Sequence, residues 1–236
     1  PTGIKAWKNG VLVTAAPEVF FAADTDGDGK ADQVDVLFSG FQEGNQQHRV
    51  NGLRWGLDNW LHLANGDSGG TIKSHKTGKT LDINGRDLRI DPETGAMEAL
   101  SGQTQFGRNR DDWGNWFGGN NSNPMWHYII EDYVLRRNPH VPAPPVRKQV
   151  SQQPGAAPVF PTSRTLTRFN DPARANRFTS ACSPIVYRDQ YLEQLVGQAF
   201  ICEPVHNLIH REIMRPDGPS FSSRRLGSES NSEFLV

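Results

Sequence analysis

The sequence predicts an all-β protein made of short strands, and three observations support this fold class. The chain of 236 residues contains 23 glycines and 16 prolines, which favours many turns over long helices. Its apolar runs are short, and polar turn residues separate them. A weak self-similarity also recurs, in which a small polar turn is followed by an apolar strand. The segments that share this pattern are 9–13, 58–62, 114–118 and 197–201.

Repeats of about 40 to 50 residues, each made of short strands, are typical of β-propeller blades. The recurrence therefore predicts that residues 1–236 form a single, partial β-propeller domain. A sandwich built from hairpins is the structural alternative, because it has the same alternation of short strands and turns.

The charge balance argues against two classes of partner. Lys and Arg number 25 and Asp and Glu number 26, so the net charge is −1. We therefore expect neither nucleic acid nor an anionic membrane surface as a partner. No apolar run approaches the roughly 20 residues that a membrane-spanning helix requires, so we expect no transmembrane segment.

A calcium loop is predicted between the first strands. Aspartates occupy positions 1, 3, 5, 9 and 12 of the segment 24–35, and Gly29 at position 6 permits a sharp turn. The flanks, Val19–Ala23 and Val34–Phe38, are too short for the helix pair of an EF-hand, so the loop is expected between strands. The proposed ligands are Asp24, Asp26, Asp28, Lys30 through its carbonyl, Asp32 and Asp35.

A β-hairpin is predicted in the centre of the first half. The apolar runs Val50–Leu57 and Trp60–Ala64 flank the pair Asp58-Asn59, two residue types that tolerate tight turns. Folding the chain at this turn brings His48 close to Asp67 at the open end of the hairpin. A carboxylate that orients an imidazole makes a general base, although both residues could equally be solvated at the rim.

A second, amide-rich rim is predicted further along the chain. Strands at 103–108 and 116–120 would bring Asn121 and Asn123 back toward Gln103. Together with Asn65, these amides suit a polar ligand or a cofactor, but they supply neither an acid nor a base. Glu203 and His206, at the end of a later strand, are either functional or ordinary surface residues.

The Pro-rich stretch 139–161 is expected to be an extended surface excursion. Beyond it, strands at 180–187 and 197–203 would place Cys182 near Cys202 across an antiparallel pair. A disulfide and a pair of buried thiols are both open at this point. Because residue 1 is a proline and residues 233–236 resemble an interrupted strand, we expect the chain to be a fragment of a longer protein.

The chain resembles a known family in four segments: Asp24–Asp35, His48–Trp60, Gly102–Gly107 and Phe200–His210. It is similar to the "membrane-bound dehydrogenase" propeller domain of planctomycete-type bacteria, which is related to the glucose/sorbosone (quinoprotein) dehydrogenases. This resemblance implies a propeller of six blades, of which the chain would supply about four. It also implies an exported protein of the periplasm or cell envelope, with a c-type cytochrome domain downstream in the parent protein. The chain itself contains no Cys-x-x-Cys-His motif for attaching haem.

In the quinoprotein relatives a propeller histidine, helped by an aspartate, removes the proton of a sugar hydroxyl while pyrroloquinoline quinone accepts the hydride. The resemblance assigns these two roles to His48 and Asp67. The chain departs from the family at Gln103-Thr104, where those enzymes place an Arg-Asn pair against the quinone. The missing guanidinium would have stabilised the reduced, anionic cofactor.

Two hypotheses of different classes follow. The first is an enzyme that oxidises a small polar substrate, a sugar or another alcohol, with a quinone-type cofactor. The second is a non-catalytic, calcium-stabilised propeller that binds a glycan or a partner domain. The family resemblance favours the first, and the missing arginine together with the amide-rich rim favours the second.

Overall fold

The computed structural model describes residues 1–138, 140, 142, 146–151, 157–162 and 176–236, and it is all-β, as predicted. The chain divides into two compact units. Unit 1 comprises residues 1–107 and 131–139, and unit 2 comprises residues 108–130 and 140–236. No helix in the described part of the chain combines the length and the apolar character needed to cross a membrane.

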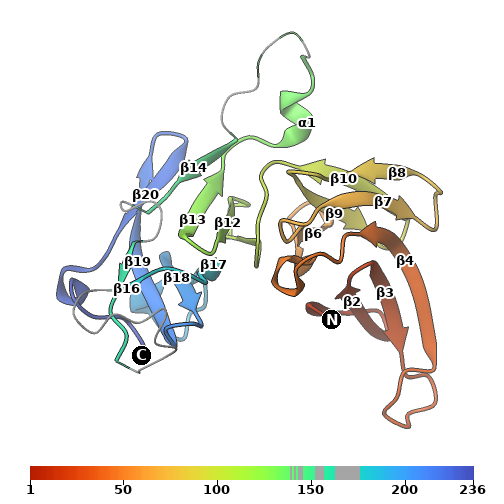
Figure 1. Ribbon diagram of the computed structural model, residues 1–236, viewed down its shortest axis with the longest axis horizontal. Coiled ribbons are helices and arrows are strands. Elements are labelled where there is room, and N and C mark those ends of the chain that lie inside the picture. The colour runs from red at the N-terminus through yellow and green to blue at the C-terminus, as the bar shows by residue number, and fades with distance from the viewer. Residues whose placement is uncertain (139, 141, 143–145, 152–156, 163–175) are drawn as a thin grey trace. The chain divides into compact units, whose positions relative to one another are not determined.

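Unit 1 contains two antiparallel sheets, and most of their strands are labelled in Figure 1. The first sheet, in spatial order, consists of β1 (Gly3–Trp7), β2 (Gly10–Ala15), β3 (Glu18–Ala23), β4 (Gln33–Phe41), β7 (Gly70–Ser74) and β8 (Thr80–Asp82). The second consists of β10 (Ala96–Leu100), β9 (Asp87–Asp91), β6 (Leu61–Ala64) and β5 (Asn51–Trp55). The 3-10 helix η1 (Gln46–His48) precedes β5, and the short helix α1 (Asp132–Leu135) also belongs to this unit.

The core of unit 1 draws on both of its sheets. In β7 the buried and exposed residues alternate strictly, so that Ile72 points inward while Thr71 and Lys73 face solvent. Phe38 from the same sheet and Leu63 and Leu88 from the other belong to one buried cluster. Burying a side chain of this size contributes roughly 1.5–3 kcal/mol, so this shared core holds the two sheets of the unit together.

Unit 2 contains two four-stranded antiparallel sheets and one short strand pair. The strands of the first sheet are β11 (Asn109–Arg110), β12 (Trp116–Asn120), β13 (Asn123–Tyr128) and β14 (Arg147–Gln149), and the pair is β15 (Pro158–Val159) with β16 (Asn176–Arg177). The last sheet contains β17 (Cys182–Val186), β18 (Gln198–Glu203), β19 (Leu208–Asp217) and β20 (Ser220–Arg224). The 3-10 helices are η2 (Glu193–Leu195) and η3 (Gly227–Glu229).

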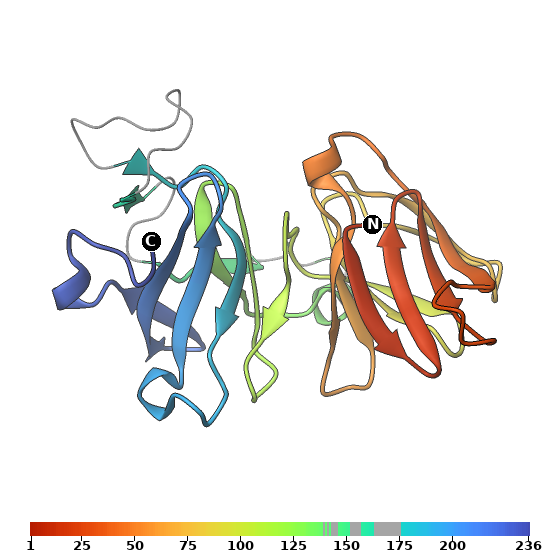
Figure 2. The same cartoon turned by 90° about the horizontal axis from the view of Figure 1, so that it is seen from below.

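In both four-stranded sheets of unit 2 the strands lie in chain order, each beside the next. Figure 2 shows this meander for β17 to β20, in blue. Residues from both sheets meet in one buried cluster, which includes Phe117 of β12 and Ile201 of β18. Arg108 is a charged exception: its side chain is fully buried, and its guanidinium lies 4.4 Å from the ring centroid of Tyr128.

The recurring sequence pattern corresponds to one structural feature, the second strand of a hairpin. Its four occurrences fall at β2, β6, β12 and β18, and each of these strands pairs antiparallel with the strand just before it. Hairpins with this local sequence are common to propeller blades and to sandwiches. None of the sheets closes on itself within the described residues.

The Pro-rich stretch 139–161 is only in part the excursion that the sequence predicted. Residues 139, 141, 143–145 and 152–156 lie outside the described residues. Within the described part, Arg147–Gln149 pairs with β13, and Pro158–Val159 pairs with β16. The prediction is wrong for these segments because Arg147–Gln149 contains no proline, and Pro158 occupies an edge strand, where no ladder hydrogen bond from its nitrogen is needed.

Candidate functional site

The acidic loop between β3 and β4 brings three of its aspartates together. Carboxylate oxygens of Asp24, Asp26 and Asp28 all lie within 4.8 Å of one another, and the three side chains are exposed. Oxygen ligands at this density suit a hard divalent cation such as calcium.

Backbone hydrogen bonds hold this loop in shape. The N–H groups of Gly29 and Gly27 donate to Asp24 at 2.8 and 2.7 Å, and these bonds lower the pKa of the Asp24 carboxyl. Both glycines have a positive φ, +82° at Gly27 and +86° at Gly29, which other residues adopt only with strain. The loop therefore presents the Asp24 carboxylate in its ionised form.

The other two predicted aspartates do not join this group, and a role for the Lys30 carbonyl stays a prediction. Asp32 accepts hydrogen bonds from the backbone N–H of Thr25, at 2.7 Å, and from the Thr25 hydroxyl, and the two bonds lower its pKa. Asp35 already lies within β4, where it accepts a hydrogen bond from Gln33 at 2.6 Å. The carboxylates converge at positions 1, 3 and 5 only, because the chain enters a strand before position 12.

The predicted hairpin is present as β5 and β6, but His48 does not lie on a strand. Pairing runs from Trp55 opposite Leu61 to Asn51 opposite Ala64, and His48 is the last residue of η1. A Cβ atom on Gly66, one residue before Asp67, would come within 2.7 Å of the His48 carbonyl oxygen, so the two segments touch through their backbones. The pairing of the His48 and Asp67 side chains stays a prediction.

Asn65 is a structural residue and not a rim ligand, contrary to the prediction. Its side chain is 1% exposed, and its amide donates to the carbonyls of Ile83, at 3.1 Å, and Arg86, at 2.9 Å. Its side-chain oxygen accepts the N–H of Asp67 at 2.6 Å. Both donors of the amide are used to join loops, which leaves none for a cofactor.

Asp87 joins the loop that contains Thr104 to the loop that contains Asn65. It is fully buried and accepts hydrogen bonds from the N–H of Asn65, at 3.0 Å, and from the N–H and hydroxyl of Thr104, at 2.9 and 2.6 Å. Further on, the N–H of Gly107 donates to Asn51 at 2.8 Å. The strand predicted at 103–108 is therefore wrong, because buried side chains satisfy the backbone of this segment in place of a partner strand.

The predicted amide rim involves both units. Gln103 is half-buried in unit 1, whereas Asn121 and Asn123 are half-buried residues of unit 2. Asn123 donates its side-chain amide to Asn120 at 3.0 Å within the β12–β13 turn. The backbone carbonyl of Asn121 accepts the N–H of Ala181 at 3.1 Å. A common ligand for these amides stays a prediction.

Two other histidines, both buried, lie beside carboxylates. His62, which is 2% exposed, lies with its Nε2 3.2 Å from Asp58, which also accepts a 2.6 Å hydrogen bond from Arg89. Burial alone would raise the pKa of Asp58, but His62 and Arg89 lower it well below its usual range. His206 lies 3.3 Å from Glu203, and both side chains are fully buried. Glu203 and His206 are therefore not the ordinary surface residues that the second interpretation of the sequence expected.

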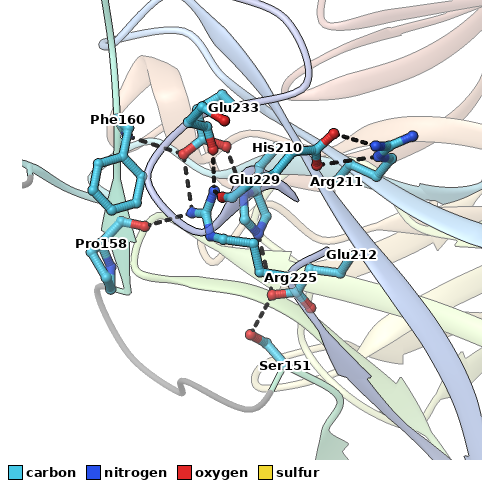
Figure 3. Close-up of polar contacts among 10 residues, drawn as sticks. Ser151, Pro158, Phe160, His210, Arg211, Glu212, Arg225, Glu229 and Glu233 are labelled. Atoms are coloured by element: carbon cyan, nitrogen blue, oxygen red, sulfur yellow. Dashed lines mark hydrogen bonds and ion pairs between the residues drawn. The ribbon is translucent and has the colours of Figure 1, made fainter. Parts of the chain in front are cut away.

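Unit 2 contains a buried ion cluster that was not predicted from the sequence (Figure 3). His210 donates from Nδ1 to Glu233 at 2.8 Å and from Nε2 to Glu212 at 3.2 Å. Arg225 donates to Glu233 at 3.0 Å, and Ser151 donates its hydroxyl to Glu212 at 2.7 Å. His210, Glu212 and Glu233 are 2%, 5% and 8% exposed, so the charges compensate one another in a nearly dry environment.

The protonation states in this cluster follow from the contacts. Burial alone would lower the pKa of His210, but its hydrogen bonds and ion pairs with the two glutamates raise it. Burial would likewise raise the pKa values of Glu212 and Glu233, and His210 lowers both. The arrangement is an imidazolium between two carboxylates. Because both ring nitrogens are engaged, His210 is not poised as a general base.

One wall of the cluster borders a cavity of about 360 Å³ that lies entirely within unit 2. His210, Glu212 and Arg225 line it on the cluster side. The exposed Arg224 and the half-buried Phe160 also line it. The guanidinium of Arg225 lies 5.0 Å from the Phe160 ring centroid, so an aromatic ring and a charged group are neighbours in the lining of this cavity.

The fold and these sites define a class: an all-β protein of antiparallel sheets, with an acidic loop in one unit and a charged cavity in the other. The profile of a family described as a domain of unknown function (DUF7133) matches residues 1–236, and the chain belongs to this family. No curated protein and no solved structure matches the chain.

Proposed function

We propose that this chain is a calcium-stabilised, non-catalytic part of a β-propeller that binds a carbohydrate. The four-stranded meanders of unit 2 support the propeller, because a blade is a sheet of four strands taken in chain order. The observation that carries the binding function is the cavity of unit 2. Its volume of about 360 Å³ falls in the usual range for small-ligand sites, roughly 300–1,000 Å³.

The lining of the cavity supports a sugar as the ligand. Sugar rings have apolar C–H faces that pack on aromatic rings, and they have hydroxyls that pair with charged and polar groups. Phe160 offers the ring, and Arg224 and Ser230 offer polar groups. Binding is favoured over catalysis because the buried titratable groups of the wall are fully engaged with one another.

The carbohydrate proposal is tested by calorimetric titration of the full chain with a panel of neutral and acidic oligosaccharides. We expect Phe160→Ala and Arg224→Ala each to weaken binding about tenfold or more, the loss of one good contact. Lys79→Ala, at an exposed position of unit 1, is the control and should bind like the wild type. Absence of binding across the panel, or binding indifferent to both cavity variants, would refute the proposal.

Calcium is proposed to rigidify the loop at Asp24, Asp26 and Asp28, because three ionised carboxylates this close repel one another without a cation. Calcium at 100 times its Kd should stabilise the fold by about 2.7 kcal/mol. We therefore expect a chelator to lower the melting temperature of the wild type. The double variant Asp26→Ala/Asp28→Ala should lose that response, and Glu43→Ala, an exposed acid elsewhere in unit 1, should keep it. A melting curve that the chelator leaves unchanged would contradict the calcium site.

Oxidation of a sugar or another alcohol is a second candidate function, and one observation favours it. The β5–β6 hairpin brings the segment of His48 and the segment of Asp67 to the same end. With pyrroloquinoline quinone and calcium added, dye reduction over a panel of sugars is the assay. Turnover that His48→Ala abolishes and the exposed control His75→Ala preserves would establish the dehydrogenase. An inactive wild type would leave only the binding function.

For either function we propose an exported parent protein of the periplasm or cell envelope. A downstream c-type cytochrome domain would be the electron acceptor in the dehydrogenase and a neighbouring domain in the binding module. Export of a reporter fused to the complete reading frame tests the location.

A further inference from the structure

The two cysteines of the chain lie directly opposite each other. Cys182 begins β17 and Cys202 lies in β18, and the two are Cα partners in this antiparallel pair. The sequence predicted that the two cysteines lie near each other across neighbouring strands, and the pairing register now places them opposite each other. Directly opposed residues of an antiparallel pair point to the same face of the sheet, so the two thiol groups share one face.

The distances in such a pair suit a disulfide. Opposed residues have Cα atoms about 5.5 Å apart at hydrogen-bonded positions and about 4.5 Å apart at the others. Both values fall within the roughly 4.4–6.8 Å that disulfides span. The strand spacing is therefore compatible with a bond between the two sulfurs.

The shared face is the outer face of the sheet. Along β18, Ala199, Ile201 and Glu203 are buried, whereas Cys202 is exposed. Cys182 is half-buried. An oxidant can therefore reach the pair from solvent through Cys202 without opening the core.

We propose that Cys182 and Cys202 form a structural cross-strand disulfide within unit 2. The two thiols lose two electrons and two protons as the S–S bond forms. The oxidant is a disulfide of the glutathione or oxidoreductase class, which is reduced to two thiols. In the first step one cysteine of the chain attacks the oxidant and forms a mixed disulfide with it. The other cysteine then displaces the second thiol of the oxidant.

The surroundings distinguish a structural bond from a rapidly exchanging one. Burial raises the pKa of Cys182 to about 12 and also raises that of Cys202. The thiolate is the reactive species, so exchange in the folded chain is slow near neutral pH. We expect the bond to form during folding, while both thiols are still solvated, and to persist afterwards.

The bond would fix the register where the strand pairing is irregular. The pairing of β17 with β18 shifts between Cys182 and Ile185, and Ser183 in that interval has a φ of +51°. A slip of one residue turns every side chain of a strand to the other face of its sheet. A covalent link at one end of the irregular interval prevents such a slip.

The full chain, refolded in a glutathione redox buffer and digested without reduction, tests the proposal by mass spectrometry. We expect the intact mass to fall by two hydrogen masses, no thiol to be alkylated after denaturation, and one peptide pair to be joined through the two cysteines. Reduction should lower the melting temperature by on the order of 10 °C.

The double variant Cys182→Ser/Cys202→Ser is the control for melting. It should melt like the reduced wild type, with or without a reductant. Two alkylatable thiols after refolding in the redox buffer, or a bond that joins two chains, would overturn the proposal. A wild type that carries the bond but melts the same when reduced would overturn its structural role.

Discussion

Replacement of His210 by leucine tests whether the buried cluster of unit 2 is held by charge. The substitution removes the only cation that contacts Glu212 among the interactions drawn in Figure 3. It also removes one of the two cations that contact Glu233, since Arg225 remains. The buried carboxylates of Glu212 and Glu233 then have fewer positively charged partners than in the wild type.

The expected loss follows from the burial of the partners. Removing one member of a buried ion pair costs about 3–5 kcal/mol, because it strands an uncompensated charge. Ser151 and Ser223 still donate to Glu212, and Arg225 to Glu233, which argues for the lower half of that range. We therefore expect His210→Leu to lower the free energy of unfolding by about 3–4 kcal/mol near pH 6.5.

The pH dependence separates lost charge from lost packing. The pKa of His210 is raised in the fold, so its stabilisation is complete below its ordinary value of 6.5 and is lost only as pH rises through the folded value. Those of Glu212 and Glu233 are lowered, so their contribution holds above 4.5 and is lost below it. Between 4.5 and 6.5 the wild-type cluster therefore contributes a constant stability.

The variant should behave differently in that interval. Without His210, burial raises the pKa values of Glu212 and Glu233, and each carboxyl takes up a proton as the pH falls. The loss of stability should therefore shrink by about 1–2 kcal/mol between pH 6.5 and about pH 5. Urea unfolding followed by tryptophan fluorescence at the two pH values measures this change.

His75→Leu is the matched control, because His75 is exposed and lies in unit 1. Its effect should stay within about 0.5 kcal/mol at both pH values. A loss below about 1 kcal/mol for His210→Leu, or an equal loss at both pH values, would show that charge does not hold the cluster.

Two further predictions concern buried polar groups. Asn65→Ala leaves one backbone N–H and two carbonyls without their partner, and it should lower the free energy of unfolding by about 2–4 kcal/mol. Asn123→Ala, in a half-buried turn, should lower it by under about 1 kcal/mol. Equal urea midpoints for the two variants would contradict the structural role of Asn65. Burial lowers the pKa of His127 from 6.5 to about 4, so the wild type should lose about 3 kcal/mol of stability as the pH falls through that interval. In the same urea titrations, His127→Gln should lose less stability over this interval. Parallel pH profiles for the two proteins would refute this prediction.

The sequence predicted those parts of the structure that local chemistry determines. The turn at Asp58-Asn59 formed as expected, with Asn59 at a φ of +61°, because this residue type tolerates that backbone. The aspartates at positions 1, 3 and 5 of the acidic loop converge because the loop alone sets their spacing. Asp35, at position 12, does not join these aspartates, because the pairing of β4 with β3 extends the strand back to Gln33. This pairing is a tertiary effect.

The roles of the polar residues at strand ends and in loops could not be assigned from the sequence. An asparagine at the end of a strand has the same local pattern whether it faces a ligand or joins loops. Asn65 joins loops because its amide reaches Ile83 and Arg86, about twenty residues away. The ion cluster did leave a signal, since alternation along β19 places His210 and Glu212 on the buried face. A strand that buries two ionisable residues must compensate them, but its partner Glu233 is remote in the chain.

The way in which short strands are joined limits which residues are available to recognise a ligand. Every loop between them exposes backbone N–H and C=O groups, and in unit 1 buried side chains such as Asn51, Asn65 and Asp87 satisfy many of these groups. Such residues have little remaining hydrogen-bonding capacity, however suitable they look for a cofactor. Under the proposed binding function, a ligand would then be recognised by side chains that face a cavity from the protein surface. Arg224 meets that condition in unit 2, which is why its substitution, and not that of the buried amides, is the decisive test of binding.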